Sequence, residues 1–216
     1  MNERLRIPKY AVIPLLLVLG WNCLVYFGVE LLAPLRRFHE VHTALDDRLP
    51  LVPEFVYIYV LAYLQWGVGY LLIAKDSRAR CWRVLSGELV AKVIALVILL
   101  LCPVTIRRPE LVPTGLSGRL LALIYAMDRP INLFPSIHCL ESWQVFRGSV
   151  GLKRYGRWYA WAQLVFTLLV FAAVLLVKQH VWPDVVAGIA VGELGRWLAK
   201  RLGADRLLAR TEGWLK

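Results

Sequence analysis

The amino-acid sequence predicts an all-α, polytopic membrane protein. Of its 216 residues, 59% are hydrophobic and only 19% are charged, and the mean hydropathy is +0.57. A soluble domain of this length keeps far more polar surface. Apolar segments of roughly 20 residues, the length that a bilayer requires, recur along the chain. We therefore expect one membrane domain over residues 1–216.

Six apolar segments predict a bundle of six transmembrane helices. The first follows a short basic stretch and is too long to be the core of a cleavable signal peptide. The fourth and sixth are the most polar, so we expect them to face the bundle interior and to line the functional cavity. The predicted spans are Tyr10–Ala33, Glu54–Ala74, Gly87–Ile106, Ser136–Val150, Trp158–Val177 and Asp184–Leu202.

The distribution of Lys and Arg predicts the orientation. The N-terminus, residues 75–85, residues 147–157 and the tail from Arg196 hold more than twice as many of these cations as the three alternating loops. Cytoplasmic loops carry the excess of positive charge. Both termini are therefore expected in the cytoplasm, with the chain in the plasma membrane, which is the inner membrane of a bacterium. The active site is expected at the extracytoplasmic face.

The net charge of +11 would suggest nucleic acid as a partner of a soluble protein. Here the charges lie in short loops between apolar segments, so membrane topology and anionic lipid headgroups explain them better. We expect membrane lipids as partners and no nucleic acid. The four cysteines form no CxxC pair or metal-ligand spacing and are read as small hydrophobic residues.

His180 and Asp184 form the first candidate catalytic pair. They are four residues apart near the predicted start of the last span, so they share one face of a helical turn. The carboxylate can then accept the imidazole Nδ1–H, which leaves Nε2 free as a nucleophile. A structural helix-end pair is the alternative, since HxxxD alone is a weak signal.

Pro135, Ser136 and His138 open the fourth span. Proline is tolerated in a first helical turn, serine can cap it, and the free N–H groups there attract anions. His138 at its rim can act as a general acid. The alternative is a capping serine beside a histidine at the headgroup boundary. The functional interpretation requires both imidazoles to converge on one pocket.

Four candidate phosphate-binding groups accompany the histidines. Arg108 follows Arg107 just after the third span, Arg129 precedes the fourth, and Lys178 ends the fifth. Guanidinium groups bind phosphate oxygens in pairs and stay charged. Contact with lipid headgroups, or snorkelling in the case of Lys178, is the alternative. Ser136 is the fourth candidate.

Three other groups of polar residues are candidates for a role near the site or inside the bundle. His39 and His42 flank Glu40 at a spacing that can hold a metal, but no further ligand follows, so we expect a solvated or lid-forming loop and no metal. Lys92 is four residues from Glu88 and is predicted to form a snorkelling ion pair. Glu141 either tunes His138 or bonds across the bundle.

Together these residues resemble the type 2 phosphatidic acid phosphatase superfamily, in the branch related to inositol phosphorylceramide and sphingomyelin synthases. Arg108-Pro109 resembles the end of the first family motif. The run 135–138 resembles the second motif, and His180 with Asp184 resembles the close of the third. The family core is a six-helix bundle, so the resemblance covers all six spans.

The resemblance implies a mechanism and its site residues. His180 would attack phosphorus to form a phosphohistidine, Asp184 would orient it, and His138 would protonate the leaving oxygen and later activate water. Arg108 and Ser136 would hold the phosphate oxygens. No metal or cofactor is required. Two family cations are absent, since positions 101 and 174 are Leu and Val, and Lys178 is expected to replace one.

The expected function is hydrolysis of a lipid phosphate or diphosphate, with no metal and through a phosphohistidine. Two alternatives remain open. A phosphotransferase would pass the phosphoryl headgroup to a lipid or polyol hydroxyl, as sphingolipid synthases do. A non-catalytic scaffold or transporter would use the same polar residues structurally, although the duplicated halves typical of transporters are not evident.

Overall fold

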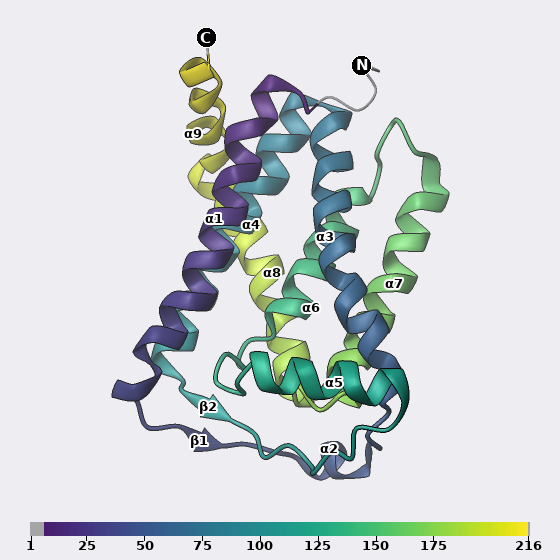
Figure 1. The fold of residues 1–216 in the computed structure, drawn as a ribbon. Coiled ribbons are helices and arrows are strands. Elements are labelled where there is room, and N and C mark those ends of the chain that lie inside the picture. Colours follow the sequence, from purple (N-terminus) through teal and green to yellow (C-terminus); the bar gives the residue numbers. More distant parts are fainter. Residues whose placement is uncertain (1–6, 216) are drawn as a thin grey trace.

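The computed structural model of the chain describes residues 7–215 and is nearly all α-helical (Figure 1). Two short strands, β1 (His39–Glu40) and β2 (Val104–Thr105), pair in parallel. The α-helices are α1 (Lys9–Leu32), α2 (Ala44–Arg48), α3 (Val56–Asp76), α4 (Arg78–Leu101), α5 (Gly115–Met127), α6 (Ile137–Ser149), α7 (Gly156–Leu176), α8 (Trp182–Leu202) and α9 (Ala204–Arg210). Short 3₁₀ helices cover Ala33–Leu35, Pro53–Phe55 and Thr211–Leu215.

Within the described residues, four helical segments are long and apolar enough to cross a membrane. The two remaining predicted spans differ from them. Helix α6 has 13 residues, about 20 Å at 1.5 Å per residue, and α8 has 21 residues but carries several charges. The fold is therefore that of a helical protein with several candidate membrane helices. These four segments are Lys9–Leu35, Pro53–Asp76, Arg78–Leu101 and Gly156–Leu176.

The predicted bounds of the third span, Gly87–Ile106, are wrong at both ends. Helix α4 begins at Arg78, where the Ser77 side chain accepts a hydrogen bond from the Arg80 N–H at 3.3 Å. Most of the predicted loop 75–85 is therefore helical. At the other end, the Arg36 guanidinium donates to the carbonyl oxygens of Leu99 and Leu100, and the chain then leaves the helix to form β2.

Helix α5 lies in the connection between the third and fourth predicted spans. It is short and apolar, and Figure 1 shows it lying across one end of the bundle. At its start Gly115 has φ +63°, a conformation that glycine adopts without strain. The helix covers the end of the bundle at which α6 and α8 begin.

Small residues bring α8 close to α4 and α6. A Cβ atom added at Gly188 would lie 2.7 Å from the Ser136 carbonyl oxygen, and one added at Gly195 would lie 2.5 Å from the Ala91 Cβ. Close approach through glycine is a common way to pack helices in membranes. The contact at Gly188 holds the first turns of α6 and α8 side by side.

The predicted snorkelling of Lys92 is also wrong. Its side chain is 1% exposed, and Nζ lies 2.6 Å from Glu141 Oε1, 3.7 Å from Glu88 Oε1 and within hydrogen-bond reach of Asn22. The Tyr70 hydroxyl donates to the other oxygen of Glu141. Lysine stays in the interior because carboxylates on α4 and α6 surround it. Glu141 therefore bonds across the bundle.

Different helices and strands lie at the two ends of the bundle. Helix α1 begins at the end where α9 lies, and α6 and α8 begin toward the opposite end, with α2, α5 and the strands (Figure 1). The two predicted histidine motifs therefore lie near the same end of the molecule.

Candidate active site

His180 and Asp184 make the predicted contact. Nδ1 of His180 lies 3.1 Å from Oδ2 of Asp184, and the same oxygen accepts the backbone N–H of Val181 at 3.1 Å. Asp184 therefore caps the first turn of α8 and holds the imidazole at once. Both side chains are buried, Asp184 almost completely. Because Nδ1 faces a carboxylate, it carries the proton, and Nε2 is the basic nitrogen.

His138 follows the N-cap of α6. The Ser136 hydroxyl accepts a hydrogen bond from the Cys139 N–H at 3.3 Å, as the sequence predicts. The Nε2 atom of His138 is buried without a hydrogen-bond partner among the described residues. A buried polar atom without a partner is costly and often marks a functional position. The imidazole is therefore available for a ligand.

Three aromatic rings of α3 surround His138. Tyr59 stacks on the imidazole with centroids 4.1 Å apart, and Trp66 and Tyr63 meet it edge-on at 4.9 and 5.2 Å. Stacked and edge-to-face arrangements of this kind are favourable contacts between rings. Rings on three sides also fix the orientation of His138.

The two imidazoles share one cavity, as the functional interpretation requires. Their ring centroids lie 6.5 Å apart, and both line a cavity of about 440 Å³. We call it the aromatic cavity. Apart from the two histidines, its lining residues are Asn22, Cys23, Tyr26, Phe27, Glu30, Tyr59, Tyr63, Trp66, Ile124, Met127, Asp128, Asn132 and Ile137.

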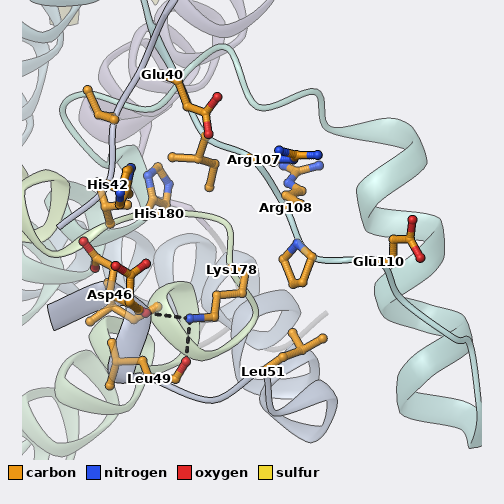
Figure 2. A pocket seen from close by; sticks show the side chains of 16 residues that line it. Glu40, His42, Asp46, Leu49, Leu51, Arg107, Arg108, Glu110, Lys178 and His180 are labelled. Atoms are coloured by element: carbon orange, nitrogen blue, oxygen red, sulfur yellow. Dashed lines mark hydrogen bonds between the residues drawn. The ribbon is translucent and has the colours of Figure 1, made fainter. Parts of the chain in front are cut away.

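His180 also lines a second cavity, of about 590 Å³, which we call the polar cavity (Figure 2). The imidazole thus lies where two cavities of different character meet. The residues of the polar cavity are Glu40, Val41, His42, Asp46, Asp47, Leu49, Leu51, Ile106, Arg107, Arg108, Pro109, Glu110, Leu175, Lys178, His180 and Val181.

The segment that contains α2 forms a roof over the polar cavity. Lys178 Nζ donates to the carbonyl oxygens of Asp46 and Leu49 at 3.0 and 2.6 Å (Figure 2). The Asp46 carboxylate accepts the Trp182 N–H at 2.8 Å, which attaches the roof to the start of α8. Lys178 was predicted to bind phosphate, but two of its three N–H groups already hold this roof.

Arg108 lies at the wall of the polar cavity, beside the segment that carries His180. Its guanidinium donates to the Gln179 side chain and to the Asp128 carbonyl oxygen, the latter at 2.8 Å, and stacks over Tyr125 at 4.5 Å. Burial lowers the pKa of Arg108, but a guanidinium remains charged near neutral pH. Its Nε atom is buried without a partner among the described residues.

Two predicted phosphate ligands do not line either cavity. Arg129 is exposed, and Ser136 is completely buried as the cap of α6. Arg107 lines the polar cavity but is exposed. The structure therefore brings Arg108 and Lys178 toward His180 and leaves Arg129 outside. Ser136 acts on the site through the backbone, since its N–H donates to the Asp184 carbonyl at 3.1 Å.

The sequence analysis missed Asp128 and the aromatic residues around it. The Asp128 carboxylate accepts the hydroxyls of Tyr26 and Tyr59 at 2.7 and 3.0 Å. The spacing of Tyr59, Tyr63 and Trp66 places them on one helix face, and that pattern was the available signal. Asp128 had none, because it lies in a loop and contacts residues far away in the sequence.

Metal ligands do not gather in the described part of the chain. Across residues 7–215, no group of three or more His, Cys, Asp or Glu side chains is arranged to hold a metal ion. His42 and Glu40 line the polar cavity, and His39 lies in β1. Glu40 and His42 thus belong to the loop over the polar cavity, whereas His39 is not among its lining residues.

No protein-family model, curated protein or solved structure matches this chain. The chemistry of the site therefore has to be inferred from its own residues. A carboxylate-held imidazole with a basic Nε2, a second imidazole at 6.5 Å and a guanidinium nearby are suited to attack on phosphorus with protonation of the leaving group.

Proposed function

We propose that this protein is an integral membrane enzyme that hydrolyses a lipid phosphate through a phosphohistidine. The observation that carries the proposal is the pairing of His138 and His180 in one cavity, with Asp184 bonded to the second imidazole. The proposal includes membership of the type 2 phosphatidic acid phosphatase superfamily, as the motifs at 108–109, 135–138 and 180–184 suggest.

The proposed chemistry has two steps. In the first, Nε2 of His180 attacks phosphorus, the N–P bond forms, the bond from phosphorus to the lipid oxygen breaks, and His138 gives that oxygen a proton. In the second, water attacks phosphorus while His138 accepts its proton, and the N–P bond breaks to release phosphate. Asp184 stabilises the positive charge that develops on His180.

Arg108 is the proposed cation for the phosphate oxygens. It is half-buried, stays charged and lies in the wall shared with His180. Lys178 contributes its charge and its remaining N–H from the roof. Preorganised donors of this kind typically account for about 10²–10³-fold of the rate of a transfer reaction.

We further propose that α1, α3, α4, α6, α7 and α8 all traverse the bilayer and that the histidines lie outside the cytoplasm. The excess of Lys and Arg at the end of the bundle that holds the start of α1 and α9 supports this orientation. Short, polar α6 is surrounded by α3, α7 and α8, which would shield it from lipid.

A phosphotransferase is the second candidate, and one observation favours it. His180 lines both cavities, so a donor lipid in one and an acceptor alcohol in the other can reach the same nitrogen. The acceptor hydroxyl would then replace water in the second step. The nucleophile and its partners are the same in both reactions.

The test is release of inorganic phosphate from a panel of lipid phosphates by the purified protein in dodecyl maltoside. We expect release by the wild type, and loss of about 10³-fold or more in His180→Ala. His39→Ala, a histidine in β1, is the matched control and should keep full activity. Equal activity in His180→Ala and wild type would exclude His180 as the nucleophile. If the protein converts none of the lipid phosphates, with or without alcohol acceptors, a non-catalytic protein would be favoured.

A further inference from the structure

We infer that the aromatic cavity recognises a positively charged ammonium group that lies next to the reacting phosphate of the substrate. The lining residues carry the inference. Among the described residues that line this cavity are two carboxylates, Glu30 and Asp128, and no Lys or Arg. The whole chain has a net charge of +11, so this absence of cations stands out against its composition. Only the identification of the phosphate depends on the proposed function.

The charge of the cavity is the first argument. A phosphate that reaches His138 and His180 would share the space with both carboxylates, and like charges repel each other. Arg108 does not line this cavity, because it contacts Asp128 from the other side, through the carbonyl oxygen. An ammonium group between phosphate and carboxylates removes the conflict.

The carboxylates are available for such a group. Glu30 makes no hydrogen bond or ion pair within the described part of the chain, although its side chain is only half-exposed. Asp128 accepts two tyrosine hydroxyls, and a carboxylate has capacity for further contacts. A negatively charged group without a partner in the wall of a cavity is evidence for a cationic ligand.

The aromatic wall is the second argument. Tyr26 and Phe27 of α1 face the same cavity as Tyr59, Tyr63 and Trp66 of α3. Ammonium groups bind aromatic faces, and quaternary ammonium ligands are typically held in cages of such rings. His138 occupies part of the α3 side, which leaves the α1 rings next to Glu30 for the ligand.

The unpartnered Nε2 of His138 places the reacting group. This atom is buried and lacks a partner among residues 7–215, and its side chain lines the cavity, so a ligand oxygen is its natural acceptor or donor. Phosphate at the histidines and ammonium at the carboxylates together fill both ends of one cavity. Two lipid classes have this chemistry: phosphodiesters with an amine headgroup, and phosphate monoesters of long-chain amino alcohols.

Equilibrium binding to the purified protein in dodecyl maltoside tests the inference. The first pair of probes is dodecylphosphocholine and dodecyl 3,3-dimethylbutyl phosphate, its isostere in which carbon replaces the charged nitrogen. The second pair is a long-chain 2-amino alcohol phosphate and the same phosphate without the amine. We expect the ammonium member of one pair to bind about tenfold more tightly than its partner without the ammonium. The pair that shows this difference identifies which of the two lipid classes the cavity binds.

Variants test where the ammonium binds. Glu30→Gln should remove most of the preference for the ammonium probe. It should weaken binding of the ammonium member and strengthen binding of the member without the ammonium, because the repulsion between Glu30 and phosphate is lost. Glu110→Gln, a carboxylate of the polar cavity, is the matched control and should keep the preference. Asp128→Asn tests the second carboxylate, but it also affects Tyr26 and Tyr59, so Glu30→Gln decides. Equal binding of both members of both pairs would overturn the inference.

The outcomes also separate this inference from the proposed function. Ammonium-selective binding that persists in His180→Ala, with no turnover of any lipid phosphate by the wild type, would keep the site and reject the enzyme. Turnover that is equal with and without the amine, and unchanged in Glu30→Gln, would keep the enzyme and reject the site.

Discussion

The backbone N–H of Ser136 donates a 3.1 Å hydrogen bond to the carbonyl oxygen of Asp184. This bond joins the N-cap of α6 to the first turn of α8, two segments that lie far apart in the sequence. His138 and His180 are each attached to one of these helix starts, so the bond fixes their separation. The site is therefore built from two helix N-termini held together through the main chain.

Asp184→Asn should slow turnover without weakening substrate binding. Asparagine keeps the size of the side chain and can still accept the Val181 N–H, but it cannot stabilise a charged imidazole. We expect kcat to fall by about 10²–10⁴-fold with KM within roughly threefold of wild type. Steady-state kinetics and a thermal melt of the detergent-solubilised variant measure this. A large rise in KM would indicate a substrate-binding role instead.

Tyr59 substitutions should reveal whether the stacked ring positions His138. Tyr59→Leu removes the stack and should lower kcat by about tenfold, whereas Tyr59→Phe keeps it and should have a smaller effect. With p-nitrophenol as leaving group the first step needs no proton from His138, so the effect of Tyr59→Leu should vanish in the pre-steady-state burst of p-nitrophenol. Equal loss on both substrates would point to a general folding defect.

Gly188→Ala should separate the two helix starts. The added methyl group would meet the Ser136 carbonyl oxygen at 2.7 Å, and main chain cannot move as easily as a flexible side chain. We expect a loss of about 1–3 kcal/mol in stability together with lower activity. Gly67→Ala, where no atom lies within 4 Å of the new methyl group, is the control. Thermal unfolding that is the same in both variants would contradict the packing.

Lys178→Met should loosen the roof over the polar cavity. The ammonium group holds the carbonyls of Asp46 and Leu49, so amide hydrogen exchange over residues 44–49 should rise by about tenfold. Lys200→Met, at the far end of α8, should leave this exchange unchanged. An increase in KM for lipid phosphate without any change in exchange would assign Lys178 to the phosphate rather than to the roof.

The proposed orientation predicts which positions a membrane-impermeant maleimide reaches. In a background with all four cysteines replaced, Arg129→Cys should be labelled in intact cells and Lys200→Cys only after lysis. Both side chains are exposed, and they lie near the starts of α6 and the end of α8 respectively. The opposite pattern would place the histidines in the cytoplasm.

The sequence predicted the elements of the site that depend on local spacing. The pairs Ser136 with Cys139 and His180 with Asp184 lie within one helical turn, so their contacts follow from helix geometry alone. Prediction failed where distant segments interact. Helix α4 starts earlier than expected, and the Arg80 guanidinium in its first turn donates to the carbonyl oxygens of Val150 and Gly151. Lys92 is buried because Glu141 of α6 forms an ion pair with it.

The helical class, the apolar segments and the two histidine motifs were therefore determined by the sequence itself, because hydrophobicity and short-range spacing are properties of neighbouring residues. Tertiary structure alone decided that His138 and His180 share the aromatic cavity and that Glu30 and Asp128 line it. It also decided that Arg108 lines the polar cavity with His180, whereas Arg129 lines neither. These distances depend on how closely helices pack, which glycine contacts and interhelical hydrogen bonds set across long stretches of chain.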